Sequence, residues 1–96
     1  MKYMNVVKFR VKPGQVEAFM AAVQEQPDWK GHIEGRTIQT GENAYCAYGL
    51  WESKDAMDAA MGSMVQWLDS VRPLLEQISP ELGVTDACSG PVILEK

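Results

Sequence analysis

A chain of 96 residues, of which 46% are hydrophobic, fits a single domain spanning residues 1–96 with one core. The formal charge of −4 comes from scattered acids and bases, and without a cluster of Lys or Arg we expect neither a nucleic-acid partner nor an anionic membrane partner. We also find no apolar run that suits a signal peptide or a transmembrane helix, so we expect a cytoplasmic protein.

The N-terminal segment predicts a strand followed by a helix. Tyr3 to Val11 is rich in β-branched and aromatic residues, and an extended backbone places alternate residues on one face. That face carries Tyr3, Asn5, Val7, Phe9 and Val11. Pro13-Gly14 interrupts the strand, and apolar residues then recur at helical spacing from Val16 to Val23. This helix should end before Pro27, because a proline disfavours the α conformation in the residue before it.

A hairpin is predicted next, with strands at His32–Thr40 and Ala44–Glu52 joined by a turn at residues 41–43. The second strand has two largely apolar faces. One face carries Tyr45, Ala47, Gly49 and Trp51, and the other carries Cys46, Tyr48 and Leu50.

A second helix should begin after Ser53, a good N-cap residue, and Asp55 in the first turn suits the helix dipole. Its apolar residues include Met57, Ala60 and Met61. Gly62-Ser63 is a candidate break, and Pro73 should kink or divide the helical stretch that follows.

The last segment, Asp86–Glu95, reads as a strand, and Gly90-Pro91 within it indicates an edge position. The element order β-α-β-β-α-β predicts an α+β ferredoxin-like sandwich, with both helices on one face of an antiparallel sheet. In this topology the last strand lies at an edge, beside the first.

The apolar character of both faces of the second hairpin strand also predicts a homodimer. A single copy would expose the face that the helices leave uncovered, and a second copy of the same sheet is a self-complementary cover. Cys46 and Cys88 lack the spacing of a zinc or redox motif, so we expect buried, reduced thiols.

Several residues on the helix-facing side are candidates for a small-molecule site. Trp51 could stack on a flat aromatic ring, or it could be a core residue. Ala47 and Gly49 leave room beside it, either for a cavity or for the close approach of a helix. A soft apolar wall or a core stripe is expected from Met57, Met61, Met64 and Trp67.

Two polar residues could act on a ligand. Asn5 lies on an otherwise apolar face, where its amide would orient a carbonyl or phenolic oxygen or would bond a neighbouring loop. His32 is the natural general base if a proton must be abstracted, and otherwise an exposed loop residue.

Two stretches carry a resemblance to a known family, namely LWESKDAM from Leu50 to Met57 and FRVKPGQVEAF from Phe9 to Phe19. With these residues the chain resembles the antibiotic biosynthesis monooxygenase family of dimeric α+β barrels. The resemblance matches Trp51 to the family tryptophan at the strand end. It also places Ala60 where many members have a histidine, and Ala47 where some aromatic-oxidising members have an asparagine.

The resemblance implies a cofactor-independent monooxygenase that acts on a quinol, an anthrone or a similar small aromatic compound. Catalytic roles are then expected for Asn5, His32 and Trp51, without metal or cofactor. Haem degradation is disfavoured because Ala60 cannot serve as an axial ligand. The alternative is a non-enzymatic ligand-binding or structural dimer of the same fold. Expected substrate contacts are Tyr45, Ala47, Gly49, Met57, Met61 and Trp67.

Overall fold

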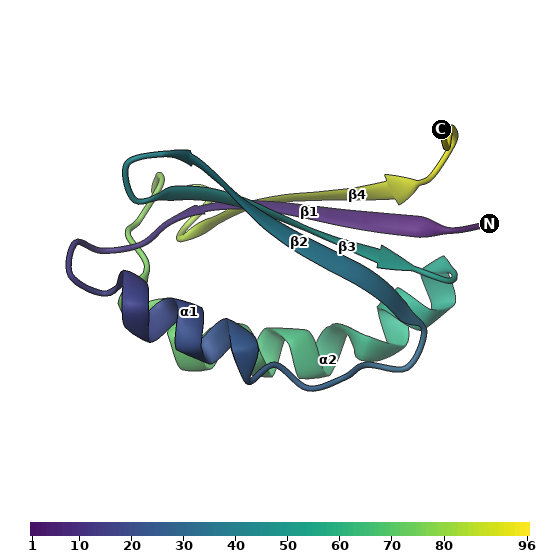
Figure 1. The fold of residues 1–96 in the computed structure, drawn as a ribbon, viewed down its shortest axis with the longest axis horizontal. Coiled ribbons are helices and arrows are strands. Elements are labelled where there is room, and N and C mark those ends of the chain that lie inside the picture. The colour runs from purple at the N-terminus through teal and green to yellow at the C-terminus, as the bar shows by residue number, and fades with distance from the viewer.

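The computed structural model describes residues 1–96 and shows a four-stranded antiparallel sheet with two helices on one face (Figure 1). This is the α+β, ferredoxin-like arrangement that the element order predicted. The elements are β1 (Tyr3–Arg10), α1 (Val16–Gln24), β2 (His32–Gly41), β3 (Ala44–Trp51), α2 (Lys54–Val71), the 3₁₀ turn η1 (Arg72–Leu74) and β4 (Thr85–Pro91). No helix combines the length and the apolar character that crossing a membrane requires.

The strand order is β2-β3-β1-β4, so β1 and β3 are central and β4 is an edge strand beside β1, as expected. However, β4 ends at Pro91 and does not continue to Glu95. Pro91 pairs with Tyr3, the first residue of β1, and one further backbone bond joins Val92 to Lys2. Beyond this bond no backbone hydrogen bond joins residues 93–96 to β1, so the segment leaves the sheet.

Helix α2 begins as the sequence suggested, since the Ser53 hydroxyl accepts a hydrogen bond from the Ala56 amide at 3.1 Å. The candidate break at Gly62-Ser63 does not occur, and α2 is continuous from Lys54 to Val71. One glycine costs a helix only about 1 kcal/mol, which the packing of the remaining helix offsets. Pro73 divides rather than kinks the helical stretch, because it lies in the separate turn η1.

The buried residues form two separate clusters between the sheet and the helices. The larger contains Phe9, Val11, Phe19, Tyr45, Val71 and Leu75, and the smaller contains Trp51, Met57 and Ala60. The Phe9 ring lies 5.0 Å from Phe19 and 5.8 Å from Tyr45, measured between ring centroids. The sheet carries small residues between the two clusters, so the core is interrupted there.

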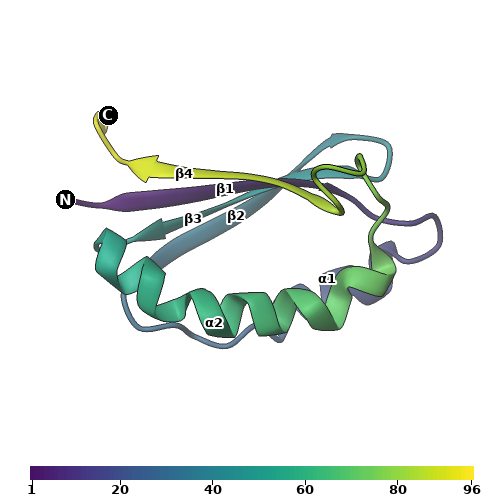
Figure 2. The same cartoon turned by 180° about the vertical axis from the view of Figure 1, so that it is seen from behind.

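The opposite, outer face of the sheet is not covered by any helix, as Figure 2 shows from behind. The register pairs Met4 with Leu50 and Val6 with Tyr48 on this face. The Tyr48 hydroxyl donates a hydrogen bond to Glu34 at 2.9 Å, and this bond, with smaller effects of burial and of the Glu34 charge, raises the pKa of Tyr48. The outer face thus carries apolar residues together with charged ones, including Lys8, Arg36 and Asp86 beside the Tyr48–Glu34 pair.

Both cysteines are free thiols, as expected, but their burial differs from the prediction. Cys46 is half-buried and Cys88 is exposed. The register places Cys46 opposite Lys8 and Cys88 opposite Val6, so both belong to the uncovered outer face and not to the core.

Candidate active site

The main cavity lies between the sheet and its helices and has a volume of about 750 Å³. Of the 28 residues that line it, 18 are hydrophobic. Binding sites for small molecules typically have volumes of about 300–1,000 Å³ and mostly apolar walls with a few polar groups. The cavity therefore has the size and lining of a site for a small, largely apolar molecule.

One corner of the cavity holds a fixed amide. Asn5 on β1 pairs with Gly49 on β3, and the Trp51 Nε1 group donates a hydrogen bond to Asn5 Oδ1 at 2.7 Å. Because an indole nitrogen can only donate, this bond determines which end of the amide faces Trp51. The amide nitrogen of Asn5 forms no hydrogen bond within the chain, and Asn5 lines the cavity.

Gly49 makes this hydrogen bond possible. A Cβ atom at residue 49 would lie 2.6 Å from Asn5 Oδ1 and 3.1 Å from Trp51 Nε1. Both distances are shorter than a relaxed contact allows, so a larger residue would displace the amide, the indole or both. Gly49 thus forms the floor of this part of the cavity, which is lined by Asn5, Gly49 and Trp51 and which we call the polar corner.

His32 joins the same corner from β2. It pairs with Trp51 across the two strands, and the centroids of the two rings are 4.8 Å apart. Its Nε2 atom would lie 3.5 Å from a Cβ atom at either Gly35 or Gly49, which are themselves cross-strand partners. The imidazole therefore lies over a pair of glycines, exposed to solvent on one side and lining the cavity on the other.

The three residues expected to be catalytic thus meet at one corner, although they come from three different strands. Of the residues expected to contact the substrate, all but one line the cavity. The cavity wall includes Ala47, Gly49, Met57, Met61 and Trp67. Tyr45 differs from the expectation: it is only 7% exposed, stacks on Phe9 in the larger cluster and does not line the cavity.

Two residues of the corner were not singled out from the sequence, namely Trp29 and Gly35. The Trp29 ring lies 6.2 Å from the Trp51 ring and 6.3 Å from the His32 ring. For Trp29, the sequence signal that could have been used is its position three residues before the only histidine. No sequence signal pointed to Gly35, because its role depends on its pairing with Gly49.

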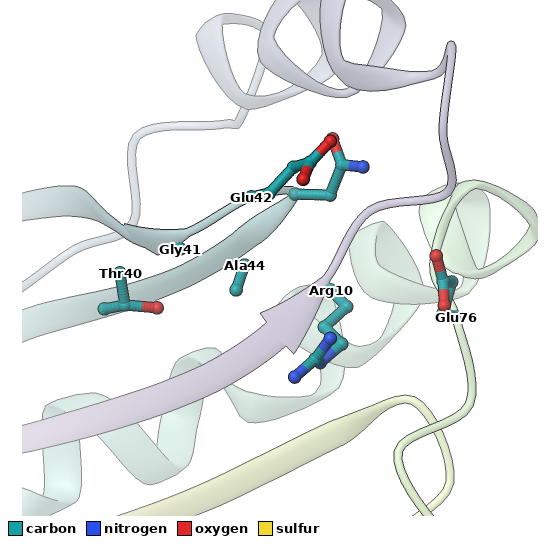
Figure 3. A pocket seen from close by; sticks show the side chains of 7 residues that line it. Arg10, Thr40, Gly41, Glu42, Ala44 and Glu76 are labelled. Atoms are coloured by element: carbon teal, nitrogen blue, oxygen red, sulfur yellow. The ribbon is translucent and has the colours of Figure 1, made fainter.

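A second, smaller pocket of about 540 Å³ lies at the opposite end of the hairpin and is polar. Figure 3 shows Arg10 between the hairpin turn with Glu42 and the segment that carries Glu76. None of these three side chains forms an ion pair. No group of three or more His, Cys, Asp or Glu residues is placed to hold a metal ion.

Solved structures share this fold at low sequence identity. A protein from Chloroflexus aurantiacus, described as a candidate antibiotic biosynthesis monooxygenase, has a TM-score of 0.76 and 19% identity over 100% of this chain and 97% of its own. Rv0793 from Mycobacterium tuberculosis has a TM-score of 0.77 and 15% identity over 99% and 98%. SnoaB, a cofactor-independent oxygenase from Streptomyces nogalater, has a TM-score of 0.67 and 16% identity over 98% and 95%.

A comparison with curated protein sequences finds no match to this chain. The sequence profile described as "Antibiotic biosynthesis monooxygenase" matches residues 2–71, which include β1, the hairpin and α2 with the whole polar corner. The chain therefore belongs to the antibiotic biosynthesis monooxygenase family.

Proposed function

We propose that this protein is a cofactor-independent monooxygenase that oxidises a quinol, an anthrone or a similar small aromatic compound with molecular oxygen. The observation that carries the proposal is the Asn5 amide, held by Trp51 with its N–H donors free, beside His32 in an apolar cavity. The family and the shared fold of SnoaB, a cofactor-independent oxygenase, support the same reaction class.

The reaction balances without any further reductant. For an anthrone, the substrate loses two hydrogen atoms from its methylene carbon and gains one oxygen atom, which becomes the new carbonyl. The second oxygen atom of O₂ leaves as water with those two hydrogens. The electrons come from the substrate, after a proton has been removed to make it electron-rich.

The residues of the corner have distinct roles in this scheme. His32 accepts the substrate proton, and its solvent-exposed side returns that proton to water. The Asn5 amide donates a hydrogen bond to the oxygen on which negative charge develops. Trp51 holds the amide in place, and the apolar wall keeps the reactive anion away from bulk water.

The sharpest test is Asn5→Asp, since aspartate keeps an oxygen that can accept from Trp51 but has no N–H donors and carries a charge. We expect oxygen uptake with an anthrone or a hydroquinone to fall by about 10²–10³-fold, as for the loss of an oxyanion donor. Asn5→Gln, which retains the donors at a longer reach, should lose less. An equal rate for wild type and Asn5→Asp would overturn the role of the amide.

The same assay distinguishes the second candidate function, a ligand-binding protein without catalysis. Wild-type uptake no faster than uncatalysed autoxidation, together with saturable binding of the aromatic compound, would favour that candidate. His32→Ala provides a further check: loss of the imidazole that accepts the proton should slow oxygen uptake, while binding of the aromatic compound should persist.

We also propose that the protein works as a homodimer, a dimeric α+β barrel in which the outer sheet faces pack together. Only 10 of the 96 residues are buried in the single chain, which is little for a stable domain. Leu50→Glu should place an unpaired charge between the two sheets at a cost of about 3–5 kcal/mol. Light scattering should then show monomers or unfolded chains, and an unchanged dimer mass would refute the arrangement.

A further inference from the structure

The loop between α1 and β2 covers the end of the cavity that holds the polar corner. Residues 25–31 form neither helix nor strand, and both views show this segment running beside α2 (Figures 1 and 2). Trp29 is the large side chain of this loop. It packs with the smaller buried cluster of Trp51, Met57 and Ala60 and lines the cavity.

Trp29 is held by contacts on two sides. Its Nε1 group donates a hydrogen bond to the Ser63 hydroxyl on α2 at 2.8 Å, and its carbonyl accepts from the His32 amide at 3.1 Å. The next anchor of the loop is the Gly31 carbonyl, which accepts from the Glu52 amide at 2.8 Å. Ser63 supplies the loop's only side-chain hydrogen bond to a helix.

This position gives Trp29 a consequence for ligand size. A ligand whose oxygen meets the Asn5 amide can extend toward Phe19 and Leu75, which line the same cavity. On the side of Trp51 and His32 the ligand meets the Trp29 ring. The centroid of that ring lies 6.2 Å from the Trp51 centroid and 6.3 Å from the His32 centroid. A cavity of about 150 Å³ accommodates benzene, and an indole is larger than benzene, so Trp29 occupies the space of at least one additional ring.

We propose that Trp29 is the specificity-determining residue that limits the size of the aromatic ligand at the polar corner, and that Ser63 is its positioning residue. This inference rests on the proposed role of the cavity as a ligand site, but not on catalysis. It assigns the loop a function in selecting substrates by the number of their fused rings.

The test compares two ligands that each carry one phenolic oxygen, the three-ring 9-phenanthrol and the four-ring 1-hydroxypyrene, by equilibrium dialysis. We expect Trp29→Ala to shift the ratio of their Kd values by about tenfold or more toward the four-ring ligand, the scale on which apolar pockets discriminate size. Ser63→Ala should shift the ratio in the same direction by a smaller factor. Gln66→Ala, exposed on the same helix and outside the cavity, is the matched control and should leave the ratio unchanged.

The possible outcomes are distinct. If wild type binds and Trp29→Ala leaves the ratio unchanged, or weakens both ligands equally, the size limit is refuted while the cavity remains a ligand site. If no protein binds either ligand, this inference and the proposed function both fail. If Trp29→Ala does not fold, Ser63→Ala decides, because it removes only one hydroxyl, and an unchanged ratio there overturns the proposal.

Discussion

The two central strands, β1 and β3, carry a packed aromatic pair at one end, the closed end, and the polar corner of the cavity at the other, the open end. At the closed end Phe9 pairs with Tyr45, and their rings stack with centroids 5.8 Å apart. Four residues away on β1, on the same face, Asn5 pairs with Gly49, and the space above the glycine is occupied by an amide and an imidazole. The backbone pairing is the same at both ends, so the difference comes from side-chain size. Large rings fill the closed end and stabilise the fold, whereas a glycine at the open end leaves space for the polar groups of the candidate site.

The helices reinforce this difference. At about 1.5 Å per residue, the nine residues of α1 span roughly half the length of the 18-residue α2. The apolar residues of α1 pack with the larger cluster at the closed end, whereas α2 contributes to both clusters. The open end is therefore covered by one helix and a loop, which leaves room for a ligand at the expense of packing.

The largest expected effect is on stability at the closed end. Phe9→Ala should lower the free energy of unfolding by about 3–5 kcal/mol, because the buried Phe9 ring packs against both Phe19 and Tyr45. Met61→Ala at the open end, where Met61 is already 42% exposed, should cost less than about 1 kcal/mol. Urea denaturation of both variants measures the contrast, and similar losses would show that the two ends are packed alike.

An intermediate effect is expected at Gly49, because a side chain there would remove the space that distinguishes the open end from the closed end. In Gly49→Ala the new methyl group would push against Asn5 Oδ1, so the Trp51 hydrogen bond should lengthen or break. We expect about 1–3 kcal/mol lower stability and at least tenfold weaker binding of a phenolic ligand. Gly62→Ala is the matched control, since nothing lies near its Cβ position on α2, and there alanine should stabilise by up to about 1 kcal/mol. Equal binding by wild type and Gly49→Ala would contradict the proposed floor.

The smallest effect is expected from a substitution that fills part of the cavity with a larger apolar side chain and so makes that region more like the core. Ala47 is half-buried on β3 and lines the cavity between the two clusters. Ala47→Leu should raise the free energy of unfolding by about 0.5–2 kcal/mol, as cavity-filling substitutions do, while weakening ligand binding. Thermal unfolding and equilibrium dialysis on the same samples measure both. A variant that is less stable and binds normally would show that the space near Ala47 is not open.

The sequence alone determined much of the architecture. Alternation on the strands, the Pro13-Gly14 interruption and the Ser53 cap predicted the element order and which strand faces meet the helices. It also predicted β4 as an edge strand. These features depend on residues that are close together in the chain, where periodicity, capping and turn preferences act directly.

Only the tertiary structure decided which residues on the helix-facing side of the sheet belong to the core and which line the cavity. Tyr45 and Ala47 have the same orientation on β3, yet Tyr45 lies in the core and Ala47 lines the cavity. His32, Asn5 and Trp51 meet because the register of three strands brings them together over Gly35 and Gly49, and Trp29 joins them through Ser63. The alternation of apolar and polar residues predicts which face of a strand a side chain lies on. Whether that side chain is packed or lines a cavity depends on where helices and loops from distant parts of the chain lie over it, and the alternation contains no information about their positions.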